Sequence, residues 1–220
     1  RIRATGAPPI PAVRGWAARY QGGAGPVLDL TQAVPGYPPH PDLLARLAAA
    51  EGDAEAAGYG PIEGEAALRE ALAADMVRAY GGRLDAADIA ITAGGNLAFT
   101  LSMMTLAGSG EAVMLPAPWY FNHRMALEAL GIPCRVLPCR AEDGFLPDPA
   151  LAASLMEGVR AIVLVTPNNP TGATYSPELI AQFAKLCRGR GAWLVLDETY
   201  RDFIPEAAGA PHGLFQDAAW

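Results

Sequence analysis

Lysine is almost absent from this 220-residue sequence. Lysine and arginine together number 16, and Lys185 is the one lysine among them. A reaction through a lysine amine would therefore have to use Lys185 or a residue outside this sequence. Charged residues make up only 18% of the chain, and the formal net charge is −7. Nucleic-acid binding requires a basic surface, so nucleic acid is not an expected partner.

Cysteines and long apolar runs are also scarce. Cys134, Cys139 and Cys187 are odd in number and lack the spacing of a metal site or a redox pair. We expect reduced thiols and no bound metal, and reduced thiols indicate the cytoplasm. No apolar run approaches the roughly 18–20 residues that cross a bilayer, so no membrane partner is expected. No basic segment followed by an apolar run marks a signal peptide.

Helical and strand patterns alternate from Pro41 onward, in a chain that is 51% hydrophobic. Helices are predicted at residues 41–52, 63–82, 96–108, 119–131, 148–158 and 176–191. Short apolar strands are predicted at residues 88–94, 111–116, 134–138, 160–167 and 192–198. Strands that are apolar along their whole length are typical of a sheet covered on both faces. The prediction is an α/β fold with a largely parallel sheet and helices on both faces.

Residues 1–40 are rich in proline and glycine, which predicts an irregular arm with one short strand at 26–31. The remaining residues, 41–220, form the α/β domain. In open α/β sheets, ligands bind beyond the carboxyl ends of the strands. The candidate functional residues are therefore those at the strand ends.

The first strand end carries "TAGGNLAF", a turn at Gly94 and Gly95 before a helix that begins near Asn96. Glycines let a ligand approach the backbone, and the free amides of a helix N-terminus attract an anion such as phosphate. An ordinary strand-to-helix turn explains the same residues equally well, because neither a Walker A loop nor GxGxxG is present.

The second strand end carries "APWYFNH", with aromatic side chains at Trp119, Tyr120 and Phe121. One of them could stack on a flat ligand ring, while the other two pack in the core. We expect His123 to be buried and hydrogen-bonded, because no metal ligand stands at metal-site spacing from it.

Two further strand ends carry "TPNNPTG" and "WLVLDETY". In the first, a fixed turn presents the amide of Asn169, and Asn168 is expected to brace the turn. In the second, Asp197 closes an apolar strand. A carboxylate is costly there unless a cation meets it, although an aspartate that caps a turn is the alternative.

In this order, the motifs resemble those of the class I/II aminotransferases, fold-type-I enzymes that use pyridoxal 5′-phosphate (PLP). "NNPTG" followed by "DETY" is typical of that family, and "YGPIEGEAALREALA" resembles its Tyr-x-Pro-x-x-Gly-x-x-x-Leu-Arg stretch. "LDLTQAVPGYPPHP" resembles its N-terminal substrate loop, and the likeness runs from about Ile10 to the end. It implies an arm with the substrate loop at 1–40. It also implies a PLP-binding large domain at 41–220 that is incomplete at its C-terminus.

The resemblance implies how the PLP ring would be held. Asp197 would pair with the pyridine nitrogen, and His123 would lie behind Asp197. Asn169 and Tyr200 would hydrogen-bond the phenolic oxygen. Tyr120 would stack on the ring, with the preceding tryptophan as the alternative. A carboxylate beside the nitrogen keeps that nitrogen protonated, which makes the ring a better electron acceptor.

The resemblance also implies a phosphate site and a subunit boundary. The backbone of Gly94, Gly95 and Asn96 would hold the phosphate. Tyr59 would reach the phosphate of the neighbouring subunit in a homodimer.

The family's Schiff-base lysine is expected after Trp220, so no catalytic residue is assigned within this sequence. Lys185 does not replace it, because it lies opposite the apolar face of its predicted helix. That face is formed by Leu179, Ile180, Phe183, Leu186 and Cys187. The arginines for the cofactor phosphate and the substrate carboxylate are also missing. The sequence is therefore expected to be a truncated piece that is inactive alone.

The substrate loop differs from the family pattern. The sequence reads Ala33-Val34-Pro35 where relatives usually have glycine before the loop proline, so no substrate preference is carried over.

The implied function is transfer of an amino group from an amino acid to a 2-oxo acid. A PLP-dependent lyase of the same fold would use the same ring-holding residues and remains an alternative. A non-enzymatic PLP-binding regulatory module is a second alternative. This sequence is acidic and contains no helix-turn-helix, but a longer N-terminus with a basic domain would favour this alternative. A nucleotide-binding α/β domain would leave "NNPTG" and "DETY" unexplained.

The 220-residue chain by itself is predicted not to form a covalent lysine adduct with added PLP, because Lys185 lies on a solvated helix face. Borohydride reduction followed by peptide mapping measures this. A label on Lys185 would show that the assignment of this lysine to the surface is wrong.

Overall fold

The computed structural model describes residues 5–29, 31–32, 36–52, 58–108, 110–205 and 209–216. This part of the chain forms two compact units. One comprises the described residues of Pro8–Ile62, and the other joins residues 5–7 to those from Glu63 onward. The expected boundary between residues 40 and 41 divides the chain by role and stays a prediction.

The N-terminal unit contains two helices, α1 (Ile10–Ala17) and α2 (Pro41–Glu51). The arm was predicted to be irregular, but α1 tolerates Pro11 because a proline in the first turn lacks only an N–H that has no intrahelical partner. Helix α2 begins after His40, whose side chain accepts a hydrogen bond from an amide of the first turn.

The predicted strand at 26–31 is wrong for its described residues. A strand requires a neighbouring strand, and these residues pair with none.

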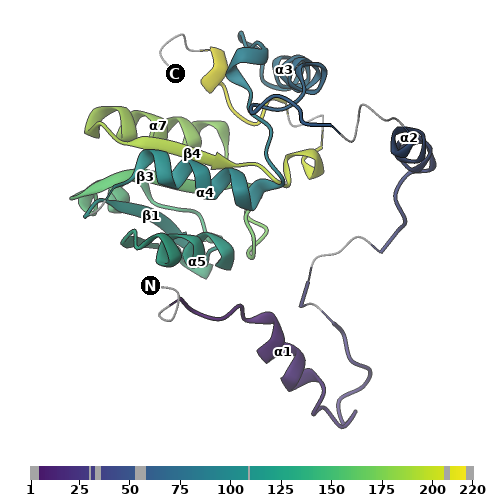
Figure 1. Cartoon of the computed structure of the whole chain (residues 1–220). Coiled ribbons are helices and arrows are strands. Elements are labelled where there is room, and N and C mark those ends of the chain that lie inside the picture. The colour runs from purple at the N-terminus through teal and green to yellow at the C-terminus, as the bar shows by residue number, and fades with distance from the viewer. Residues whose placement is uncertain are drawn as a thin grey trace. The chain divides into compact units, whose positions relative to one another are not determined.

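The larger unit is built on a parallel four-stranded sheet (Figure 1). Its strands are β1 (Ala112–Ala117), β2 (Cys134–Pro138), β3 (Val159–Val165) and β4 (Trp193–Asp197). They lie in the order β2-β1-β3-β4, and each neighbouring pair is parallel. The α/β class with a parallel sheet is therefore confirmed.

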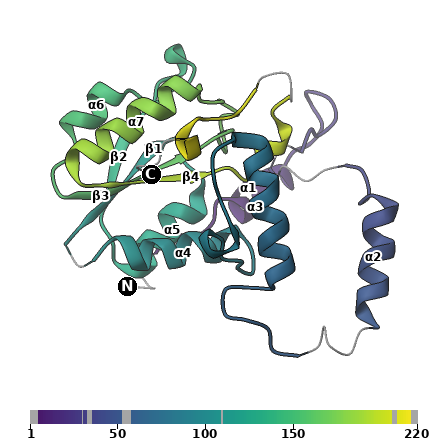
Figure 2. The same ribbon diagram turned by 90° about the horizontal axis from the view of Figure 1, so that it is seen from above.

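Helices cover both faces of this sheet, as Figures 1 and 2 show. One face carries α4 (Gly95–Leu106) and α5 (Phe121–Leu130), and the other carries α6 (Pro149–Ser154) and α7 (Pro177–Arg190). None of the helices in the described chain is both long and apolar enough to traverse a bilayer.

The strands send alternate side chains to the two faces. Met114 packs in the cluster beneath α6 and α7, whereas Val113 and Leu115 pack in the cluster beneath α4 and α5. All three side chains are buried. Burial on both faces is the physical reason that β1 is apolar at every position.

The predicted strand at 88–94 is also wrong. Ala86–Asp88 form a short 3-10 helix, and Ile89 then has extended backbone with φ −113° and ψ 131°. Ile91 donates a backbone hydrogen bond to Glu63 at 2.8 Å, but no strand of the described sheet pairs with this segment. The helix that follows begins at Gly95, next to the predicted start at Asn96.

Helix α3 (Ala66–Tyr80) precedes this segment and buries Tyr80 near its end. Figure 2 shows α3 apart from the helices that cover the sheet.

Helix α7 turns the fully buried Phe183 and Ile180 toward the sheet and leaves Lys185 exposed. The surface position predicted for Lys185 is therefore confirmed.

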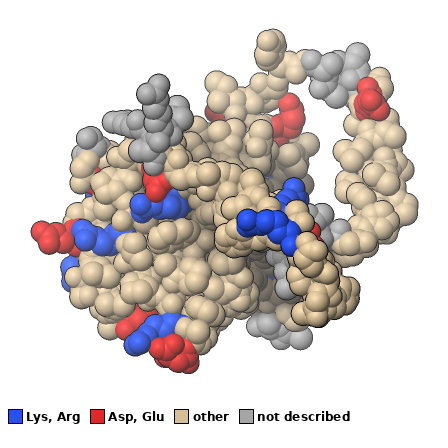
Figure 3. Space-filling model, turned by 90° about the horizontal axis from the view of Figure 1, so that it is seen from below, with Lys and Arg blue, Asp and Glu red and all other residues tan. Residues whose placement is uncertain are grey.

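Charge is sparse on the surface as well. On the face drawn in Figure 3, basic and acidic side chains lie interspersed among uncharged ones. Ion pairs such as Arg140–Glu142 and Arg160–Glu111 bring the two signs together locally. The charge distribution on the drawn face is thus mixed rather than basic.

Phe183→Ala is expected to lower the free energy of unfolding by about 3–5 kcal/mol, because it empties a closed site between α7 and the sheet. Urea unfolding of the full-length protein measures the loss. Lys185→Ala on the same helix is the control and is expected to change stability by less than about 0.5 kcal/mol. Equal losses in the two variants would contradict the packing described here.

Candidate functional site

A small pocket lies beyond the carboxyl ends of β3 and β4. Its volume is about 160 Å³, and its lining is Gly95, Asn96, Tyr120, Val165, Asn169, Asp197, Thr199 and Tyr200. This set contains all the predicted cofactor-binding residues except Gly94 and Tyr59. Gly94 is the N-cap residue of α4 and directly precedes the lining residue Gly95. Residues far apart in the sequence therefore meet at the strand ends, as expected for a parallel sheet.

Asp197, the last residue of β4, is held by hydrogen bonds on both carboxylate oxygens. Its Oδ1 accepts from the backbone N–H of Thr199 at 3.0 Å and from the Thr199 hydroxyl at 2.6 Å. Its Oδ2 lies 3.1 Å from Nε2 of His123. Three donors thus fix the orientation of the carboxylate.

The same contacts keep Asp197 charged. Burial raises the pKa of its carboxyl, but the hydrogen bonds from His123 and Thr199 outweigh burial and lower the pKa to about 2. The side chain keeps 23% of its surface exposed, and among the described residues His123 is the one basic side chain in contact with it. The pocket therefore contains an ionised carboxylate that can still accept a hydrogen bond from a cationic group.

His123 is 2% exposed and is enclosed by aromatic rings. Phe99 of α4 stacks on it with ring centroids 4.0 Å apart, and Tyr120 meets it edge-on at 5.2 Å. The prediction of a buried, hydrogen-bonded histidine behind Asp197 is confirmed. These rings leave the imidazole little freedom to turn away from the carboxylate.

The two asparagines after β3 have different surroundings. Asn168 is 6% exposed, and its Oδ1 accepts from the N–H and the hydroxyl of Thr171 at 3.1 and 2.8 Å. Its backbone carbonyl accepts from Gly172 at 2.8 Å. Asn168 therefore braces the turn, as predicted, and the turn leaves Asn169 in the pocket lining.

The glycine turn before α4 depends on a backbone conformation that is restricted to glycine. Gly94 has φ 90° and ψ 160°, which a residue with a Cβ rarely adopts. The hydroxyl of Thr92 donates to the Gly94 carbonyl at 2.9 Å and stabilises the turn. Helix α4 then starts at the pocket, and the first amides of a helix have no intrahelical acceptor. This end of the pocket can bind an anion.

Tyr120 is the aromatic residue in the pocket. Its hydroxyl accepts a hydrogen bond from Nδ2 of Asn122 at 2.6 Å. Trp119 instead packs against the core beneath α4 and α5, with the guanidinium of Arg124 5.7 Å from its ring centroid. This arrangement favours Tyr120 over Trp119 as the side chain that would contact a ligand ring.

Sequence reasoning missed Thr199, which provides two of the three donors to Asp197. The signal was available, because an aspartate followed two residues later by threonine can form a local side-chain-to-backbone turn.

Tyr59 lies in the N-terminal unit and is fully exposed there, so its role stays a prediction. The substrate-loop difference at Ala33-Val34-Pro35 lies outside the described residues.

Comparison with known proteins decides the family. The family model described as "Aminotransferase class I and II" matches residues 26–218. The chain belongs to this aminotransferase family. The pocket therefore lies at the strand ends of a class I and II aminotransferase domain.

Individual relatives agree with this. An aromatic aminotransferase of Arabidopsis thaliana is 32% identical over 182 residues, which cover 80% of this chain and 45% of the relative. The valine–pyruvate aminotransferase of Mycobacterium tuberculosis is 30% identical over 205 residues, covering 92% and 53%. This aminotransferase chain spans about half the length of the curated relatives that it matches.

Solved structures show the same fold. The crystal structure of an aminotransferase from Mycobacterium tuberculosis superposes with a TM-score of 0.79 at 30% identity, over 90% of this chain and 51% of that one. The aspartate aminotransferase from Thermus thermophilus with maleate gives a TM-score of 0.75 at 29% identity, covering 90% and 52%.

The lowered pKa of Asp197 predicts a specific dependence of stability on pH. A folded-state pKa of about 2, below the ordinary 3.8, stabilises the fold above about pH 4, and this contribution is lost as the pH falls toward 2. The contribution is about 2 kcal/mol. Asp197→Asn is expected to flatten the decline in unfolding free energy between pH 4 and 2, measured by urea titration. Glu157→Gln, at an exposed position, is the control, and an equal flattening there would contradict the assignment.

Proposed function

We propose that the intact protein is a PLP-dependent aminotransferase that moves an amino group from an amino acid to a 2-oxo acid. One observation carries this proposal. An ionised carboxylate, Asp197, ends an apolar strand and lines a pocket that also contains the start of a helix. Family membership supplies the reaction class, and the carboxylate supplies the reason that the cofactor would bind at this place.

The residues in the pocket fit PLP in their chemistry. The cofactor has an anionic phosphate, a flat ring, a phenolic oxygen and a pyridine nitrogen that can be protonated. The pocket offers a helix N-terminus, an aromatic ring, an amide with a phenol, and a carboxylate, one for each group. The pocket volume is about 160 Å³, which is smaller than that of enclosed ligand sites, usually about 300 Å³ or more.

Bound PLP would supply an electron acceptor for the bond that breaks at the amino-acid α-carbon. The Asp197 carboxylate would hold a proton on the pyridine nitrogen. His123 and Thr199 would keep that carboxylate ionised and in place.

The remaining lining residues would position the cofactor. Asn169 and Tyr200 would hydrogen-bond the phenolic oxygen, and Tyr120 would stack on the ring. The backbone amides that follow Gly94, at Gly95 and Asn96, would bind the phosphate. The lysine that binds PLP covalently is proposed to follow Trp220 in the longer chain.

We further propose a homodimer, in which Tyr59 would reach the phosphate site of the neighbouring subunit. Its full exposure within the N-terminal unit is compatible with this role.

The cytoplasm is the proposed location, and the described cysteines are free thiols. The substrates would be small molecules, namely an amino acid and a 2-oxo acid. The relatives named above differ in the substrate that their names give, so no single amino acid is assigned.

The reaction is tested with the full-length protein, PLP and a panel of amino-acid donors. Formation of the matching 2-oxo acid and of a new amino acid from an added acceptor is the expected outcome. Release of ammonia together with pyruvate, independent of an acceptor, would instead identify a lyase. A full-length protein that binds no PLP would refute both.

Asp197→Asn is expected to lower kcat/KM on the order of 100- to 1000-fold, because it removes a preorganised charge from the reacting centre. Steady-state kinetics with the best donor measures the loss. Asp148→Asn is the matched control: Asp148 is exposed and caps α6, and asparagine caps a helix equally well. Equal activity in the two variants would contradict the role given to Asp197.

A further inference from the structure

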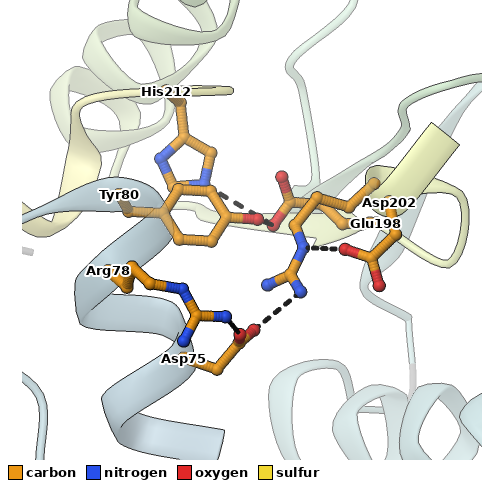
Figure 4. Close-up of polar contacts among 7 residues, drawn as sticks. Asp75, Arg78, Tyr80, Glu198, Asp202 and His212 are labelled. Carbon is orange, nitrogen blue, oxygen red and sulfur yellow. Dashed lines mark hydrogen bonds and ion pairs between the residues drawn. The ribbon is translucent and has the colours of Figure 1, made fainter. Parts of the chain in front are cut away.

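Glu198 follows Asp197 directly, and its carboxylate lies in a polar cluster behind the pocket rather than in the pocket lining. Successive residues of an extended chain point to opposite sides. Glu198 therefore contacts Tyr80 at the end of α3 and His212, as Figure 4 shows. The Glu198 side chain is 17% exposed, and those of Tyr80 and His212 are fully buried.

One oxygen of Glu198 accepts a hydrogen bond from Tyr80 and also lies near His212. The Tyr80 hydroxyl donates to Oε2 at 2.7 Å. His212 accepts a hydrogen bond from the N–H of Leu214 at its Nδ1, so a neutral ring carries its proton on Nε2. That nitrogen lies 3.6 Å from the same Oε2, too far for a hydrogen bond but close enough for attraction. The Tyr80 and His212 rings also stack, with centroids 4.5 Å apart.

Arg201 provides a second connection to helix α3. Its Nη2 lies 2.8 Å from Oδ2 of Asp75, and its guanidinium lies 5.8 Å from the centroid of the Tyr80 ring. Its backbone N–H donates to the Glu198 carbonyl at 2.9 Å, which closes the turn between the two residues. The turn after β4 is thus fastened to α3 at both of its ends.

Burial makes these contacts stronger than equivalent surface contacts. Burial raises the pKa of Tyr80, and the hydrogen bond to Glu198 raises it further, so the hydroxyl remains a donor at neutral pH. Loss of one partner would leave a partly buried carboxylate without its hydrogen bond, which is far less favourable than loss of the same bond on the surface.

The peptide bond between Glu198 and Thr199 links this cluster to the pocket. Its N–H is the backbone donor to Oδ1 of Asp197. A rotation of Glu198 would therefore displace that donor, and the Thr199 hydroxyl with it. The backbone that carries the Glu198 side chain therefore also carries a donor to Asp197.

We propose that Tyr80, Glu198 and Arg201 are positioning residues: they fasten the turn after β4 to helix α3 and so keep the Thr199 donors on the Asp197 carboxylate. The fastening of the turn to α3 is a property of the protein without cofactor. Only the expected change in PLP binding rests on the proposed function.

The test uses the full-length protein and four variants. Tyr80→Phe removes the hydroxyl and keeps the stacked ring. Glu198→Ala removes the carboxylate, whereas Glu198→Gln keeps an acceptor for Tyr80. Ile180→Val is the control, because it loosens the core under α7 without touching the cluster.

The first measurement is amide hydrogen exchange without PLP, by mass spectrometry of a peptide that spans residues 197–203. Exchange there is expected to be about tenfold faster in Tyr80→Phe and Glu198→Ala, with a smaller change in Glu198→Gln. Peptides from β3 should be unchanged in these variants. Ile180→Val should not accelerate the turn selectively. Unchanged exchange at the turn, or a uniform increase over the whole chain, overturns the proposal.

The second measurement is the dissociation constant of PLP by fluorescence titration. It is expected to rise about tenfold in Tyr80→Phe and Glu198→Ala, less in Glu198→Gln, and not at all in Ile180→Val. Faster exchange at the turn with an unchanged dissociation constant overturns the positioning role. If the wild-type protein binds no PLP, the proposed function fails, and hydrogen exchange alone decides whether the turn is fastened. If Tyr80→Phe does not fold, Arg201→Gln replaces it under the same criteria, because its side chain is partly exposed.

Discussion

The ionised Asp197 carboxylate at the end of an apolar strand is the constraint on which the site depends. A charge in such a place is unfavourable unless donors surround it. Here one donor comes from α5 and two come from the turn that follows the strand itself. The aromatic rings pack around His123, and the turn after β4 carries the Thr199 donors, so both donor groups are held against one side chain.

The parallel sheet explains why the donors and the pocket coincide. Its strands end at a common edge, so the turns after β3 and β4 lie next to one another, and the start of α4 lines the same pocket. Each turn has a supporting residue and a presented residue. Asn168 braces the turn that presents Asn169, and Glu198 is tied to α3 behind the turn that carries Asp197 and Thr199.

The two sides of the turn after β4 show how function and stability are divided along a short segment. Asp197 and Thr199 line the pocket, where a partly exposed carboxylate remains able to bind a ligand. Glu198 contacts a buried phenol and imidazole instead, and Arg201 pairs with Asp75 of α3.

Family relatives are about twice as long as this chain, but the ring-holding residues proposed here all lie within it.

The sequence by itself determined the four strands of the sheet, most helices and most of the pocket lining. Continuous apolar runs specify strands buried on both faces, and motifs such as "NNPTG" and "DETY" depend on local turn chemistry. Only the tertiary structure decided the rest. The segment at 88–94 has a strand-like sequence but no partner strand in the described sheet, and pairing is a property of two segments. Likewise, the contacts of Glu198 with Tyr80 and His212 join residues far apart in the chain, and no local pattern encodes which distant side chains will meet.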